Sequence, residues 1–363
     1  MKNKIFGVVL IMVSLLLIVG CSPSEKVIKI GNIGIISGQG ASWGVAAKNG
    51  IDLAVAEINA DGGINGKMLA VDHQDDKGDS KEAINAFNNL VDVKGVKIVI
   101  GTTWSSTGMP LANLADSKKV LLISPSLGKP EFNEGSDYIF NTWPHDYILS
   151  KNLADYVYEK GHRNVALIGA EELWVKDQTN AFKQRFEELG GKVSVLVEPL
   201  PDQKDVGTEA LKIKNGKDVD ALVSTTDGIL VGALVAKRAK EIGVDLPIYS
   251  ITIDADAIAA AGGAYEGMEF LTFLNPTSEF KQKYEAKYGT LDIGAPSAYD
   301  AVMMIADAMK KTGSEDPTKL QEYLNSVKEY NGASGKLVAD GKGGFTKEGA
   351  TRKIVNGKIT NLQ

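Results

Sequence analysis

The sequence is poor in the residues that most often build reactive or metal-binding sites. Cysteine occurs once among 363 residues and histidine three times. The single cysteine, Cys21, allows no disulfide within the chain. His73, His145 and His162 lie far apart on different expected elements, which gives little support to a catalytic triad or a zinc site. No G-x-x-x-x-G-K-[ST] phosphate loop is present, so energy for any ATP-driven process must come from a separate ATPase. We expect neither a cofactor nor a metal.

Long hydrophobic runs are also lacking beyond the N-terminus. The one such run, 5–19, follows Lys2 and Lys4 and ends in small residues before Cys21. This order is typical of a secretory signal. An uncleaved membrane anchor is the alternative, but the run is shorter than the roughly 20 residues that a span needs.

The residues Ile18-Val19-Gly20-Cys21 resemble a bacterial lipobox, in which the cysteine is lipidated and becomes the mature N-terminus. The resemblance implies a signal peptide over 1–20, a polar tether over 21–26 and an extracytoplasmic protein held to the membrane by its lipid. Cleavage would leave 343 residues with 38 basic and 46 acidic side chains, a formal charge of −8. Nucleic acid is therefore not an expected partner, because phosphate neutralisation needs clustered Lys and Arg. A chain of this length can build two cores.

Short apolar runs alternate with amphipathic stretches from residue 27 onward. The runs predict strands at 27–36, 68–72, 96–100, 120–123, 165–168, 193–197, 221–223 and 248–251. Helical spacing separates most of them, and Asp79 with Glu82 is a plausible capping pair before one helix. This alternation predicts an α/β fold with parallel sheets and helices on both faces.

The two halves of the chain echo each other. Residues 99–101 run into a loop that carries Trp104, and residues 167–169 run into a loop that carries Trp174. Each half also has its own set of strands and helices, so two similar doubly wound lobes are the economical interpretation. In such sheets, ligands bind at the carboxyl ends of the strands.

Hydroxyl-bearing residues gather at one of these strand ends. Ser105, Ser106 and Thr107 are expected to begin the next helix, where free N–H groups and hydroxyls suit a carboxylate. Trp104 would add apolar area or a face for a cation. The alternative is that Ser105 or Ser106 only caps the helix and that Trp104 only packs.

Four segments, in order and spacing, resemble the branched-chain amino-acid-binding type of periplasmic binding protein, which delivers solutes to ABC transporters. They are IISG (35–38), AVAEINADGGINGK (54–67), VIG (99–101) and ISP (123–125). The similarity spans about 27–331. It implies the type I periplasmic binding protein fold, with two Rossmann-like lobes joined by three crossovers around a ligand cleft. The expected crossings lie near 141–143, 272–274 and 337–343, which gives lobe I as 27–142 and 274–337, and lobe II as 143–273 and 338–363.

The resemblance also implies polar ligand-binding residues on lobe I. Ser105 stands where the family has a serine for the ligand carboxylate, next to the N–H group of Ser106. Ser126 and Gly128 stand where the family has a backbone carbonyl and a threonine for the amino group. Gly128 departs from that pattern, because it lacks the hydroxyl.

Aromatic and acidic positions complete the implied site. Trp43 and Trp174 match positions that flank the ligand side chain from opposite lobes, and we expect Trp104 to join that wall. Asp227 stands where the family often has tyrosine, and a carboxylate there could hold an ammonium group. A further acid is expected after the following strand, and three positions stay open: Thr252, Asp254 (the reserve partner for the ammonium group) and Asp256.

These features lead us to expect a binding protein for a small solute. An amino acid of the branched-chain type is the first candidate, and amides, other amines and aromatic acids stay open because of Gly128 and Asp227. ABC permease and ATPase subunits are the implied partners of a monomeric chain. The same fold could instead present a ligand to a receptor as a sensor.

Two other chemistries have partial motifs. Residues 126–129 fit the S-x-x-K motif and residues 311–313 the K-T-G motif of penicillin-recognising serine enzymes. Pro130 interrupts the helix that the first motif needs, and the second motif ends a helical pattern rather than forming a strand, so no enzyme is expected.

Residues 75–79 contain acidic residues like those of a calcium-binding loop, but they lack its glycine and its final glutamate. A solvated loop is expected there.

Overall fold

Five parallel strands form the first sheet of the computed structural model, which describes residues 27–362. Their order in space is β2 (Leu69–Asp75), β1 (Ile28–Gly34), β3 (Ile98–Gly101), β4 (Leu121–Ser124) and β5 (Ile139–Asn141). Every residue of β3, β4 and β5 is buried, as expected for strands covered on both faces. The expected signal peptide, the tether and Cys21 lie outside the described residues.

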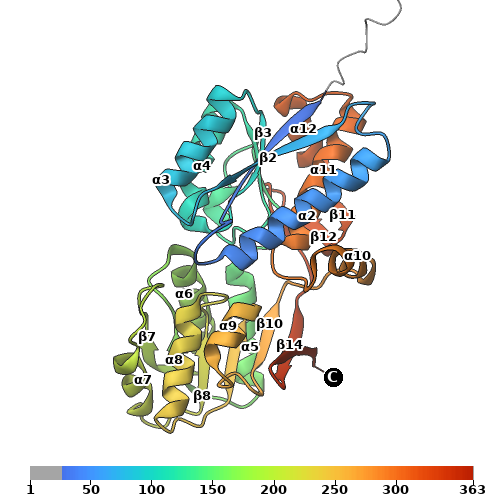
Figure 1. Cartoon of the computed structure of the whole chain (residues 1–363). Helices are drawn as coiled ribbons and strands as arrows, with labels where there is room; N and C mark the ends of the chain where they lie inside the picture. The colour runs from blue at the N-terminus through green and yellow to red at the C-terminus, as the bar shows by residue number, and fades with distance from the viewer. Residues whose placement is uncertain (1–26, 363) are drawn as a thin grey trace, which may run out of the picture.

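Helices cover both faces of this sheet (Figure 1). One face carries two helices from the first part of the chain, α3 (Ser80–Asn88) and α4 (Ser105–Lys118). The other face carries α2 (Ala41–Ala60) together with three helices from late in the chain: α10 (Ser278–Tyr288), α11 (Ala295–Thr312) and α12 (Pro317–Ser326). Residues that are more than 200 positions apart in sequence thus share one core.

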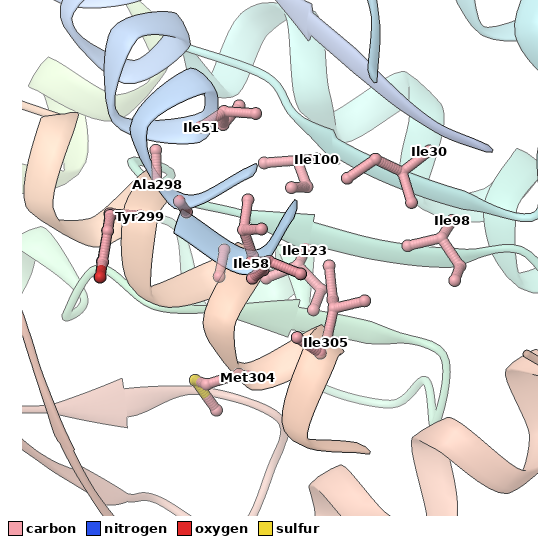
Figure 2. Packing of buried hydrophobic residues seen from close by; sticks show 14 of the residues in the cluster. Ile30, Ile51, Ile58, Ile98, Ile100, Ile123, Ala298, Tyr299, Met304 and Ile305 are labelled. Carbon is pink, nitrogen blue, oxygen red and sulfur yellow. The ribbon is translucent and has the colours of Figure 1, made fainter. Parts of the chain in front are cut away.

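Apolar spacing explains how α2 and α11 dock on the sheet. The expected positions Ile51 and Ile58 of α2 are buried, and Figure 2 shows them beside Ile100 and Ile123 of the sheet and Ile305 of α11. Capping sets the start of α3, where the Asp79 carboxylate accepts hydrogen bonds from the N–H groups of Lys81 and Glu82 at 2.9 and 3.0 Å. The predicted cap is confirmed at Asp79, whereas the Asp79 N–H bonds to the Asp76 carbonyl rather than to the Glu82 side chain.

A seven-stranded sheet organises the second lobe. Its order in space is β15 (Lys358–Asn361), β14 (Ala350–Val355), β10 (Glu269–Thr272), β9 (Ile248–Ile251), β8 (Ala221–Ser224), β6 (Asn164–Ile168) and β7 (Lys192–Val197). The last five are parallel, and the C-terminal hairpin of β14 and β15 adds antiparallel to β10. The helices of this lobe are α5 (Asp146–Glu159), α6 (Leu173–Glu188), α7 (Gly207–Lys214), α8 (Leu230–Glu241) and α9 (Ala255–Ala261).

The third crossing between lobes does not lie where the sequence led us to expect it. A small antiparallel sheet of β11 (Glu329–Gly332), β12 (Gly335–Ala339) and β13 (Phe345–Thr346) occupies that stretch. Leu337 and Phe345 are buried in the first-lobe core, so the passage to the second sheet falls between β13 and β14. The glycines of 341–344 make a turn closed by Asp340, which accepts N–H bonds from Lys342 and Gly344. The expectation of a crossing at 337–343 was therefore wrong, because the glycines there form the turn between β12 and β13.

Residues next to the three passages between lobes touch one another. β5 ends at Asn141 and β10 at Thr272, next to the other two expected crossings. Just beyond them, the rings of Trp143 and Phe273 meet edge to face with centroids 5.9 Å apart. The Lys347 ammonium lies 5.3 Å from the Trp143 ring centroid. These contacts therefore join residues next to all three passages between the lobes.

Candidate functional site

The two lobes touch, and one contact joins two tryptophans that the sequence analysis selected. Trp43 on α2 and Trp174 on α6 meet edge to face, with centroids 6.3 Å apart and planes at 89°. Both are buried. Lys129 of the first lobe forms an ion pair with Asp177 of α6. These contacts describe lobes that are closed on each other.

The start of α4 differs in detail from the expected anion site. Trp104 occupies the cap position and Ser105 is the first helical residue, so neither Ser105 nor Ser106 caps the helix. Ser105 is only 2% exposed. The Thr107 N–H is bonded to the Trp104 carbonyl at 3.1 Å, and the Thr107 hydroxyl is bonded to Thr102. Within residues 27–362 the backbone N–H groups without a backbone partner at this helix end are therefore those of Ser105 and Ser106, and the expectation that the Thr107 N–H contributes was wrong. The Ser106 side chain interacts with the carboxyl of Glu172 and partly offsets the rise that burial causes in the pKa of that carboxyl.

Three indole groups carry unused hydrogen-bond donors near the lobe contact. The ring nitrogens of Trp43, Trp104 and Trp174 are buried without a hydrogen-bond partner among residues 27–362. Trp104 packs on the loop after β1, where a Cβ placed on Gly40 would lie 2.7 Å from its ring. Buried donors normally have partners, so these three indole N–H groups are candidate ligand contacts.

The loop after β4 presents backbone rather than hydroxyl groups. The Ser126 hydroxyl donates to the carbonyls of Thr102 and Thr103 at 3.1 and 2.9 Å, which ties this loop to the one before α4. A Cβ placed on Gly128 would lie 1.5 Å from the Oδ2 atom of Asp146. No larger residue fits at 128 while Asp146 keeps its place. Sequence reasoning missed Asp146, which comes directly after the first crossing.

Buried carboxyl groups line the second-lobe side of the contact. Asp227 is 2% exposed, and its Oδ1 atom has no hydrogen-bond partner in the described part of the chain. Burial, with the nearby charges of Asp146 and Asp254, holds the pKa of Asp227 well above its usual range. Burial also raises the pKa of Asp146 and of Asp254 to about 7. The Gln178 amide on α6 partly offsets the rise in the pKa of Asp146 and of Asp227. Its Nε2 and Oε1 atoms are buried without a full hydrogen bond within residues 27–362.

The three positions left open after β9 are now distinguished by burial. Asp256 is exposed, whereas Thr252 and Asp254 are buried. Asp254 caps α9 by accepting the Ala257 N–H at 2.7 Å, and its pKa is raised further by Asp292 of the first lobe. The Thr252 hydroxyl is buried and lacks a partner among the described residues. Thr252 and Asp254 therefore remain as candidates.

The contacts of the serine-enzyme motifs do not make a reactive pair. Lys129 is paired with Asp177 and Glu131, and the Ser126 hydroxyl is bonded to two carbonyls. The K-T-G residues end α11, and Gly313 adopts the left-handed conformation with φ of 62°. The lysine is therefore not available to activate the serine.

The carboxylates of the 75–79 loop accept hydrogen bonds from backbone N–H groups. Asp75 accepts hydrogen bonds from the N–H of Ile36 and from the Ser37 hydroxyl, and it ties the loop after β1 to the end of β2. Asp76 is fully buried, and burial raises its pKa to about 6. The expectation of a solvated loop was therefore wrong at Asp76. No group of three or more His, Cys, Asp or Glu residues within 27–362 is placed to hold a metal ion.

The residues that sequence reasoning missed gave weak signals. Asp146 is the first residue of α5, where an acid is common because it complements the helix dipole. Gln178 is one of many polar residues on α6. Only the fold brings both next to Asp227. A membrane-spanning helix is not found in the described range.

Comparison with known proteins places the chain in a family. The model of the family described as "Periplasmic binding protein" matches residues 27–351. The leucine-, isoleucine-, valine-, threonine- and alanine-binding protein of Pseudomonas aeruginosa is 28% identical over 337 residues, which cover 89% of this chain and 88% of that protein. The crystal structure of the branched-chain amino acid transporter substrate binding protein LivJ from Streptococcus pneumoniae, in complex with isoleucine, superposes with a TM-score of 0.85 at 28% identity and covers 92% of this chain and 98% of that one.

A third relative carries a different ligand on the same fold. A solute-binding protein of an ABC transporter from R. palustris, in complex with 4-hydroxybenzoate, has a TM-score of 0.83 at 23% identity, covering 93% of this chain and 96% of that one. These relatives are named as solute-binding proteins rather than enzymes, and their family is extracytoplasmic. The predicted two-lobed α/β fold is confirmed, and the chain belongs to the periplasmic binding protein family.

Proposed function

We propose that this protein is the solute-binding component of an ABC importer and that its two lobes close on an amino acid of the branched-chain type. The similarity to binding proteins named for leucine, isoleucine and valine supports this assignment. The partners would be a permease and an ATPase, because the chain has no nucleotide-binding loop of its own. The protein acts by binding and carries out no chemical conversion.

The observation that carries the proposal is the buried carboxyl of Asp227, whose Oδ1 atom has no hydrogen-bond partner among residues 27–362. A buried charge without a partner is costly, and a ligand ammonium group would supply a charge-assisted hydrogen bond to the free Oδ1 atom. Ser105 and the first turn of α4 would receive the ligand carboxylate from the other lobe. Trp43, Trp104 and Trp174 would enclose the apolar side chain.

The same carboxyls argue against an aromatic acid as the solute. A benzoate carries a negative charge and no ammonium group, whereas Asp146, Asp227 and Asp254 are all buried on the second-lobe side. An anion would therefore meet acidic groups there unless those groups took up protons. An amine-bearing solute turns the same groups into binding partners.

Calorimetry with a defined solute panel tests the proposal. Leucine, isoleucine and valine are compared with benzoate and 4-hydroxybenzoate, using wild type, Asp227→Asn and the exposed control Asp245→Asn. A true ligand at 100 times its Kd should stabilise the fold by about 2.7 kcal/mol. Asp227→Asn should weaken amino-acid binding about tenfold or more, because hydrogen bonds to charged groups contribute roughly 1.5–3 kcal/mol. Binding of benzoates with no response to any amino acid would refute the proposed solute.

We also propose a lipid anchor at Cys21, which lies outside the described residues. The support is the lipobox-like sequence after an apolar run. Mass spectrometry of the native protein should find an N-terminal, lipid-modified Cys21, and Cys21→Ala should leave the precursor unprocessed. An intact Met1 or an unmodified Cys21 in the native protein would rule the anchor out.

A further inference from the structure

We propose that Asp146 is a ligand-binding carboxyl that receives the amino group of the solute together with Asp227, and that residue 128 is glycine because this carboxyl occupies the space beside it. The inference rests on the proposed function and identifies the group that recognises the amine. It also explains how the loop after β4 can lack a side-chain hydroxyl at Gly128.

Three contacts fix the position of Asp146, two of them through its side chain. Its Oδ1 atom accepts a hydrogen bond from the Trp143 indole N–H at 3.0 Å. Its backbone N–H donates to the Gly128 carbonyl at 3.0 Å. Its Oδ2 atom lies against the Cα of Gly128, in the position that a side chain at 128 would need. One carboxylate oxygen is thus used to orient the group, and the other is directed at the first-lobe loop.

Asp146 borders a space between the lobes. A cavity of about 180 Å³ is lined by residues of both lobes, among them Gly128, Asp146, Tyr147 and Trp174. Lys129 and Asp177, the ion pair that joins the lobes, line it as well. The carboxyl therefore stands at the wall that also contains Trp174, one of the expected ligand-flanking residues, and it is 8% exposed.

Acidic side chains outnumber basic ones around Asp146, because Lys129 lines the same cavity but is paired with Asp177. Asp227 is near enough that the Asp146 charge raises its pKa, and Asp177 likewise raises the pKa of Asp146. The Gln178 amide faces Asp146 and Asp227 but carries no charge. A single ammonium group placed at these two carboxyls would relieve their repulsion and satisfy the free Oδ1 of Asp227.

The test measures selectivity for the amine rather than affinity alone. The readout is the ratio of the Kd values of 4-methylpentanoate and leucine, which differ only by the amino group. Asp146→Asn keeps the oxygen that accepts the Trp143 bond, so the fold should persist while the ratio falls at least about tenfold. Trp143→Phe removes the bond that orients the carboxyl, and the exposed Asp245→Asn is a charge control that should leave the ratio unchanged.

A compensating pair of substitutions tests the steric part. Gly128→Ser alone should abolish leucine binding, because its Cβ meets the Asp146 carboxyl. Gly128→Ser combined with Asp146→Ala removes the clash and puts a hydroxyl in its place, so leucine binding should return at least in part. If folded Asp146→Asn gave the same ratio of the Kd values of 4-methylpentanoate and leucine as wild type, the inference would be overturned. The proposed function would remain intact. A wild type that binds no amino acid would overturn both.

Discussion

The indole of Trp43 stands perpendicular to the indole of Trp174 across the lobe contact, with ring centroids 6.3 Å apart. The two residues are 131 positions apart in the sequence and belong to different lobes. Each ring is almost fully buried by the other lobe and by its own. The two rings come from different lobes, so this contact requires that the lobes are closed on each other.

We predict that Trp43→Ala and Trp174→Ala each weaken solute binding about tenfold or more, because each removes apolar wall that is buried on closure. A double-mutant cycle on the binding free energy should give a coupling of about 0.5–1.5 kcal/mol for the pair. The control is Tyr299→Leu, which breaks the first-lobe contact between Phe280 and Tyr299. That variant should change the unfolding temperature and leave Kd alone. Additive effects of the two tryptophan variants would contradict a direct contact in the bound state.

Ser105→Ala should weaken binding of amino acids by about tenfold, because the hydroxyl at the first helical position of α4 would donate to the ligand carboxylate. The matched control is Ser117→Ala, near the exposed C-terminal end of the same helix, where the hydroxyl bonds to the Leu114 carbonyl. Titration calorimetry on both variants separates the two cases. Equal Kd values for Ser105→Ala and wild type would remove Ser105 from the site.

Solute affinity should depend on pH in a direction set by the buried acids. The pKa values of Asp146 and Asp254 are about 7 in the fold, against 3.8 for an ordinary aspartate. Between these values the folded protein holds more protons than the unfolded chain, so stability without solute should fall as pH rises through that window, by up to about 1.4 kcal/mol per unit and group. An ammonium ligand needs the deprotonated carboxyls. Leucine affinity should therefore rise from pH 5 to pH 8.

Calorimetry over that pH range checks this expectation, and Asp227→Asn should reduce the slope because one titrating partner is lost. The side chains that shift the pKa of Asp146 are Trp143, Gln178 and Asp177, and those that shift the pKa of Asp254 are Asp292 and Asp256. Lys129 lines the same cavity as Asp146 and is paired with Asp177. A flat profile for wild type would mean that the acids do not touch the solute.

Breaking the Lys129–Asp177 ion pair should favour the open arrangement of the lobes. Lys129 is largely buried and Asp177 is partly exposed, and such a pair is worth at most about 1 kcal/mol, or roughly fivefold in the open–closed equilibrium. Solution scattering of Lys129→Ala without solute should give a larger radius of gyration than wild type. The control Lys118→Ala breaks an ion pair with Asp92 inside the first lobe and should give the wild-type radius. If saturating solute left the radius of gyration of both wild type and Lys129→Ala unchanged, closure by domain motion would be contradicted.

The sequence predicted the structure correctly where the apolar pattern of a single segment determines a strand or the buried face of a helix. All eight predicted strands are present, and the apolar spacing of α2 buries Ile51 and Ile58 as expected. The strand signal is a short apolar run and the helix signal is an apolar spacing of 3.6 residues, and each lies within a single segment. Strands with weaker local signals, such as β5 and the short strands after Glu329, were not predicted.

Long-range packing decided what local sequence left open. The glycines of 341–344 favoured a flexible crossing, but a hairpin used them because Asp340 closes their turn and Phe345 enters the first-lobe core. Asp146 carried no signal of its own, since an acid at a helix start is ordinary. Its position against Gly128 depends on the first crossing, which sets α5 against a loop of the other lobe.

The sequence by itself determined the α/β class, the two lobes, the strand ends that carry Ser105 and Trp174, and the departures at Gly128 and Asp227. These follow from patterns within short segments and from a resemblance that depends on residue order. Only the tertiary structure decided which acids are buried together, that Trp43 meets Trp174, and that a carboxyl fills the space beside Gly128. The physical reason is that burial and charge coupling arise between segments that are distant in the chain, so no single segment encodes them.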